Sequence, residues 1–92
     1  MRILVSDQAK EWLTRLSPAS KHRVRLALRA LAADRARDVR ALQGPLAGFY
    51  RLRVGGYRLV LSYHAGQAIH VDYADVRDVV YERFLELVSR DR

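Results

Sequence analysis

The chain has 92 residues, half of them hydrophobic, and a formal net charge of +7. Its length is that of one domain, so we expect a single domain over residues 1–92, and the hydrophobic share argues against disorder. The sequence contains no cysteine, no apolar run of about 18 residues that could span a membrane, and no N-terminal apolar run long enough for a signal peptide, which favours a cytoplasmic protein.

The strong basic charge favours an anionic partner, whether nucleic acid, an acidic protein segment or a membrane surface, and the alternative explanation is simple solubility. Fifteen of the 17 basic residues are arginine, a side chain that binds phosphates through a fork of donors and keeps its proton near neutral pH.

The first third of the chain has the pattern of a short strand followed by two helices. The strand covers residues 2–5, and Ser6 or Asp7 can cap the first helix. The apolar residues of that helix recur at helical spacing: Ala9, Trp12, Leu13 and Leu16. Ser17-Pro18 then begins a second helix that ends near residue 33, so the pair forms an αα-hairpin.

One face of the second helix carries basic residues four positions apart: Lys21, Arg25 and Arg29. This pattern is either a solvated face or a functional stripe that follows nucleic-acid phosphates or faces a protein partner.

The rest of the chain is predicted to form a meander and a last helix. Residues 34–40 read as a polar linker, Leu42 begins a short strand, and residues 44–48 form a turn. Three strands over residues 49–54, 57–63 and 68–74 precede a helix over about 78–89. We therefore expect an α+β fold, in which the N-terminal strand and αα-hairpin pack on a small, mainly antiparallel twisted sheet, with a C-terminal helix.

Gly55-Gly56, between two β-rich runs, is a strong signal for a two-residue hairpin turn. This turn pairs Arg53 with Arg58 and gathers Arg51, Arg53 and Arg58 on the face opposite the core. Like charges placed directly opposite destabilise a sheet by up to about 1 kcal/mol, and a bound anion would reverse that effect. The hairpin therefore predicts an anion-binding face, unless the arginines extend along the sheet into water.

A three-residue turn over residues 65–67 is predicted next, because it keeps Ile69, Val71 and Tyr73 in the core. His70 and Asp72 then join the arginine face, with Asp72 beside Val60, and His70 becomes a candidate for binding nucleic acid. The three histidines lack metal-ligand spacing and no glycine-rich phosphate loop occurs, so we predict neither a metal nor a cofactor.

The stretch from Leu42 to Val60, with its Leu-x-Gly, Tyr-Arg-x-Arg and Gly-Tyr-Arg elements, resembles the RelE/ParE superfamily of bacterial and archaeal type II toxins. Arg77-Asp78-Val79-Val80-Tyr81 is similar to the start of the last helix in that family, and the order of the elements also matches. The resemblance covers nearly the whole chain.

The resemblance implies a toxin that cleaves mRNA in the ribosome, where the 2′-hydroxyl of the messenger attacks the adjacent phosphate without a metal. It implies that Arg51, Arg53, Arg58 and Arg77 grip the phosphate and that Tyr81 is the tyrosine of the active site. The implied partners are a cognate antitoxin, the ribosome and mRNA, with operator DNA bound only through the antitoxin complex and no membrane partner.

Two departures from the family keep alternatives open. Arginine replaces the usual lysines at residues 51 and 53, which leaves Tyr81, His70 or Asp72 as candidates for the general base, and Asp75 adds negative charge near the expected phosphate. The alternatives are a ParE-like inhibitor of DNA gyrase and an inactivated toxin that serves only as a binding and co-repressor module.

Overall fold

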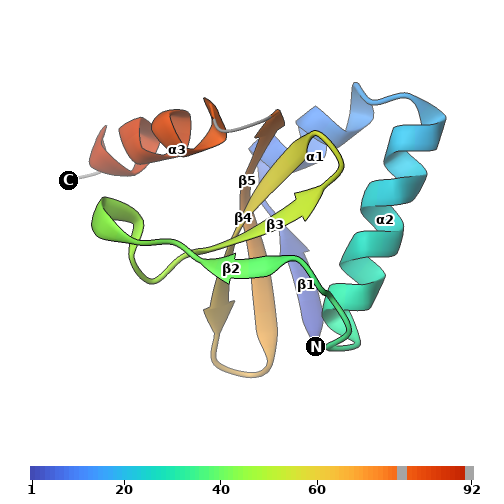
Figure 1. Cartoon of the computed structure of the whole chain (residues 1–92), viewed down its shortest axis with the longest axis horizontal. Coiled ribbons are helices and arrows are strands. Elements are labelled where there is room, and N and C mark those ends of the chain that lie inside the picture. Colours follow the sequence, from blue (N-terminus) through green and yellow to red (C-terminus); the bar gives the residue numbers. More distant parts are fainter. Residues whose placement is uncertain (77–78, 91–92) are drawn as a thin grey trace.

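The computed structural model describes residues 1–76 and 79–90, and a five-stranded sheet lies at its centre (Figure 1). The strand order is β1-β5-β4-β3-β2. Neighbouring strands are antiparallel except β1, which is parallel to β5. The strands are β1 (Arg2–Val5), β2 (Val39–Ala41), β3 (Tyr50–Val54), β4 (Tyr57–His64) and β5 (Ala68–Val76). The predicted α+β fold with a mainly antiparallel sheet is confirmed, but Leu42 follows β2 and does not begin a strand.

The helices lie on both sides of the sheet, α1 and α2 on one face and α3 on the other (Figure 1). They are α1 (Asp7–Thr14), α2 (Pro18–Ala32), the short 3-10 helix η1 (Gly44–Leu46) and α3 (Val79–Arg90). Ser6 and Ser17 cap α1 and α2, since each side chain accepts a hydrogen bond from the backbone N–H three residues later. Within the described residues, no helix has both the length and the apolar composition needed to cross a membrane.

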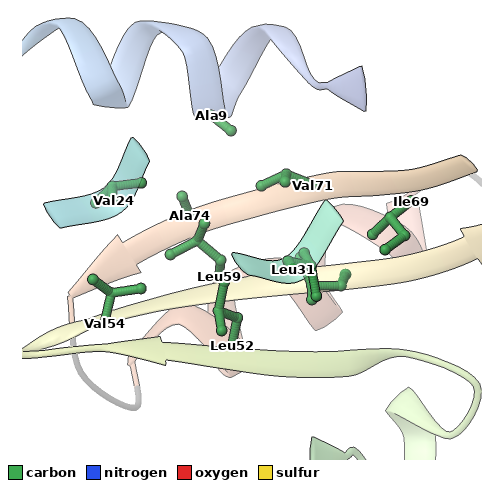
Figure 2. Packing of buried hydrophobic residues seen from close by; sticks show 10 residues of the cluster. Ala9, Val24, Leu31, Leu52, Val54, Leu59, Ile69, Val71 and Ala74 are labelled. Carbon is green, nitrogen blue, oxygen red and sulfur yellow. The ribbon is translucent and has the colours of Figure 1, made fainter. Parts of the chain in front are cut away.

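Two apolar clusters hold these layers together. The first lies between the α1/α2 pair and the sheet, where Val24 and Leu31 of α2 contact a strand surface that includes Leu52 and Leu59 (Figure 2). The second lies under α3 and consists of buried residues from η1, β4 and α3: Leu46, Val60, Val80 and Phe84. Both sheet faces are therefore covered in part, and the face under α3 is the one that carries the predicted arginines.

A β-bulge in β5 changes the predicted register. The three-residue turn is confirmed, because His64 pairs with Ala68, but Leu61 pairs with Val71 whereas Val60 pairs with Tyr73, so Asp72 is the extra residue. Tyr73 thus lies on the α3 face, with its ring 6.0 Å from that of Phe84. The prediction that Tyr73 belongs to the core under α1 and α2 was wrong, and Ala74 occupies that core instead.

The edge of β5 beyond β1 is covered by a side chain. β1 ends at Val5, and the amide of Gln8 in α1 then bonds to the Ala74 backbone. Its Nε2 donates to the Ala74 carbonyl at 2.7 Å and its Oε1 accepts from the Ala74 N–H at 2.8 Å. One side chain therefore makes two backbone hydrogen bonds that a continued parallel β1 would divide between two of its residues.

Candidate functional site

The three hairpin arginines lie together on the sheet face that α3 partly covers. Arg53 pairs with Arg58 and Arg51 with Val60, as predicted. Gly55 has a φ of 58° and Gly56 a φ outside the left-handed region, which is the pattern of a type II′ turn. Val60 is buried under α3, so its cross-strand neighbour Arg51 lies on the same face.

Asp38, just before β2, is the acidic partner of two of these arginines. Its Oδ1 accepts a hydrogen bond from Arg51 Nη1 at 3.2 Å, and its Oδ2 lies 3.8 Å from Arg53 Nε. The Arg51 side chain is only 14% exposed. Asp38 therefore offsets part of the repulsion within the arginine cluster, a role that the sequence pattern did not predict because residues 34–40 resemble a polar linker.

Arg58, the central arginine, is half-buried and bonds to its own hairpin. Its Nη1 donates to the carbonyls of Gly55 and Tyr57, each at 3.0 Å. Across the sheet Arg58 pairs with Asp75 of β5. Asp75 in turn accepts a hydrogen bond from Arg83 of α3, and this contact raises the pKa of Arg83. The charge of Asp75 is thus shared with a further arginine that the sequence pattern did not single out.

Tyr81 comes to the same face from α3. It is partly buried at the margin of the cluster under α3, and that helix is anchored by Phe84, whose ring packs edge-on against Phe49 at 4.9 Å. The structure therefore brings Arg51, Arg53, Arg58 and Tyr81 to one side of the sheet. Arg77, the remaining candidate, lies outside the described residues.

The basic stripe of α2 lies elsewhere. α2 packs on the opposite face of the sheet through Val24 and Leu31, so its basic side chains are separated from the hairpin arginines by the sheet: Lys21, Arg25 and Arg29. They do not form one site with the arginine face.

His70 belongs to a separate polar cluster toward the other end of β4. It pairs with Ser62, four residues from Arg58, which is roughly 13 Å along a strand. Ser62 Oγ lies 2.6 Å from Asp72 Oδ2 and 2.7 Å from His64 Nε2, and the rings of His64 and His70 stack at 3.8 Å. The bulge therefore moves Asp72 out of register with Val60, contrary to the prediction, and joins it to Ser62.

Burial sets the electrostatics of that cluster. Loss of solvent raises the pKa of Asp72 above its ordinary value, and the hydrogen bond from Ser62 and the nearby imidazoles partly oppose the shift. Among the described residues, no group of three or more His, Cys, Asp or Glu side chains has a geometry that could hold a metal ion.

Comparisons with known proteins relate this fold to toxins. No family model and no curated protein matches the sequence. A chain of the RelBE2 toxin–antitoxin complex from Mycobacterium tuberculosis superposes with a TM-score of 0.71 at 24% identity, covering 83% of this chain and 96% of that chain. The archaeal RelE–RelB complex from Pyrococcus horikoshii gives a TM-score of 0.66 at 26% identity, covering 84% and 94%.

The YoeB/ParE toxin from Agrobacterium tumefaciens gives a TM-score of 0.67 at 19% identity and covers 84% of this chain and 99% of that chain. These structures span nearly the same length as the chain and share its mixed five-stranded sheet with three helices. The resemblance that the sequence predicts is thus confirmed at the level of the fold: the chain has the fold of RelE-like toxins.

Proposed function

We propose that this protein is the toxin of a type II toxin–antitoxin system and that it cleaves mRNA on the ribosome without a metal. The observation that carries the proposal is the convergence of Arg51, Arg53, Arg58 and Tyr81 on one face of a RelE-like fold. The proposal is supported by the similar folds found in a RelB–RelE antitoxin–toxin complex and in a YoeB–YefM toxin–antitoxin complex.

The arginines fit the charge that develops in this reaction. When the 2′-hydroxyl of the RNA attacks the adjacent phosphate, negative charge accumulates on the phosphorane oxygens, and positioned cations stabilise it. Arg58 is held by two backbone carbonyls, and Arg51 is held by Asp38, so both guanidinium groups lose little freedom when the phosphate binds.

Tyr81 is the preferred candidate for proton transfer or for stacking on a base. Arginine is a poor base near neutral pH, so the hairpin arginines do not provide the general base. His70 and Asp72 lie in the polar cluster that begins roughly 13 Å from Arg58 along β4, too far for direct proton transfer at a phosphate bound by Arg58.

We propose that the antitoxin neutralises this protein with an acidic amphipathic segment. A hollow of about 360 Å³ between α2 and β3 is lined by apolar residues, by three arginines and by one carboxylate: Ala27, Ala30, Ala36 and Leu52, with Arg35, Arg37, Arg53 and Asp38. Its apolar surface and its excess of positive charge suit such a segment. Binding there would engage Arg53 and remove it from the substrate. Ala30→Glu should prevent co-purification with the product of the neighbouring gene, while Ala19→Glu, in the exposed first turn of α2, should not.

Cleavage of ribosome-bound mRNA tests the catalytic proposal. Arg58→Ala should lose most of the activity because the central phosphate ligand is absent, yet it should still bind the antitoxin. Arg15→Ala, which removes an exposed arginine that pairs with Glu11 in α1, is the matched control and should cleave normally. Wild-type protein that cuts no ribosome-bound mRNA would rule out the nuclease.

A second candidate function follows from Asp75. A carboxylate opposite Arg58 lowers the affinity of that position for a phosphate and favours a ParE-like role, in which the protein inhibits DNA gyrase by protein contact. Gyrase supercoiling assayed with excess protein tests this alternative, and undiminished supercoiling would contradict it. A protein that neither cleaves ribosome-bound mRNA nor inhibits gyrase, and that is harmless when expressed without its antitoxin, would be the inactivated binding module.

A further inference from the structure

A second surface on the arginine-bearing side of the sheet remains unused by the proposed function. It consists of Arg2, Leu4, His64 and His70, which we call the histidine platform. Leu4 pairs with His70, and Arg2 pairs with Ala68, which pairs with His64. Ile3 and Val5 pack into the cluster under α1 and α2, so strand alternation directs Arg2 and Leu4 to the other face.

The two histidines of the platform form a ready-made stack. Their ring centroids are 3.8 Å apart with an interplanar angle of 24°. His64 is exposed, and Leu4 beside His70 is 46% exposed, so aromatic and apolar surface meets solvent here. Flat aromatic surface with an apolar border and an adjoining guanidinium is a surface on which a nucleobase can stack.

Hydrogen bonds through Ser62 and Asp72 hold the His64 ring in place. The hydroxyl of Ser62 has a single proton, and an ionised Asp72 can only accept, so Ser62 donates to Asp72 Oδ2. His64 Nε2–H must then donate to Ser62 Oγ. Ser62 is only 9% exposed, so this chain fixes the orientation of the ring before any ligand arrives and reduces the entropy that binding costs.

We propose that the histidine platform binds a base of single-stranded RNA by stacking on His64, with Arg2 on the adjoining phosphate. This inference rests on the proposed function, because the RNA is the substrate of the arginine face. His64 and Arg58 are six residues apart on β4, roughly 20 Å, so the platform holds a nucleotide outside the cleaved position. It adds affinity and positions the messenger, but it takes no part in the chemistry.

The test measures stacking apart from cleavage. A short single-stranded RNA that carries 2-aminopurine and 2′-O-methyl groups resists attack by its own 2′-oxygen, and quenching of its fluorescence reports base stacking as protein is added without ribosomes. His64→Gln keeps a hydrogen-bonding group near Ser62 but removes the ring, so it should weaken binding about tenfold. His64→Phe keeps a ring and loses the hydrogen bond, and it should bind within about threefold of wild type.

His22→Gln is the matched control, since His22 is exposed on α2 away from the platform, and it should bind like wild type. The inference would be overturned if the Gln and Phe variants of His64 bound the RNA with equal affinity. It would also be overturned if wild-type protein did not quench the fluorescence. Loss of antitoxin binding in His64→Gln with unchanged RNA binding would also overturn it, because the surface would then contact protein.

The outcomes separate this inference from the proposed function. Wild-type protein that quenches the RNA but cleaves nothing on the ribosome would retain the platform and remove the nuclease. Cleavage that is unaffected by His64→Gln, with unchanged quenching, would retain the nuclease and remove the platform. If the nuclease and the histidine platform are both correct, His64→Gln should raise the KM for messenger while kcat changes little.

Discussion

Gln8 allows a direct test of how α1 secures the edge of β5. Gln8→Ala removes two hydrogen bonds, of 2.7 and 2.8 Å, to the backbone of Ala74. Ala74 is 0% exposed, so water cannot readily replace the lost partners. Each hydrogen bond contributes about 0.5–1.5 kcal/mol, so we expect the substitution to lower the free energy of unfolding by about 1–3 kcal/mol.

Urea denaturation followed by circular dichroism measures this loss. With a slope of about 1 kcal/mol per molar urea, as is usual for small proteins, the midpoint should decrease by about 1 M or more while the slope stays constant. Gln43→Ala is the control, because Gln43 is exposed and its side chain makes no capping hydrogen bond to η1. Its midpoint should match wild type.

Gln8→Glu distinguishes loss of hydrogen bonding from loss of side-chain volume. The carboxylate still accepts from the Ala74 N–H, but it faces the Ala74 carbonyl without a donor, so this variant should also be destabilised. If Gln8→Ala and wild type unfold at the same urea concentration, the amide does not act as an extension of β1 and this reasoning fails.

Three further predictions concern the candidate site and its supports. Phe84→Ala removes the ring that contacts Phe49 and Tyr73, so it should lower the free energy of unfolding by about 3–5 kcal/mol in urea denaturation. It should also reduce cleavage, because α3 is no longer held in position on the sheet. A small loss of stability with full activity would contradict this prediction. Because burial raises the pKa of Asp72, its ionisation destabilises the fold, so wild type should lose stability relative to Asp72→Asn as the pH rises from below about 4 through the folded pKa, measured by urea denaturation across that range. A stability difference between wild type and Asp72→Asn that stays constant across this pH range would contradict this prediction. Asp38→Asn removes a negative charge between Arg51 and Arg53, so RNA affinity measured by fluorescence anisotropy should increase and fall more steeply with salt; weaker binding would mean that Asp38 chiefly positions the arginines.

The hairpin was predictable because two local signals agreed. Gly55-Gly56 specifies a two-residue turn, and strand alternation then assigns each of the neighbouring side chains to a face, so the pairing of Arg53 with Arg58 follows without tertiary information. The caps of α1 and α2 were predictable for the same reason, since Ser6 and Ser17 act on backbone groups only three residues away.

The compensating charges were not predictable in this way. Asp38 contacts Arg51 and Arg53 only because β2 pairs with β3, and a three-residue strand inside a charged segment has too little hydrophobic pattern to be recognised. Asp75 was recognised as an unfavourable charge, but its partner Arg83 lies on α3, and contacts between a strand and a later helix depend on how the helix docks. The repulsion inferred for the hairpin is therefore smaller in the folded protein than in the isolated hairpin.

The bulge at Asp72 explains how one strand serves both surfaces. Ile69 and Val71 pack under α1 and α2 at one end of β5, and Ala74 does so at the other, although strict alternation would direct Ala74 outward. The extra residue restores the inward direction at Ala74 and turns Tyr73 and Asp75 toward the α3 face. The same residue supplies the carboxylate that orders Ser62 and His64. A single inserted position thus allows β5 to complete one core, to pair with Arg58 at one end, and to support the histidine platform at the other.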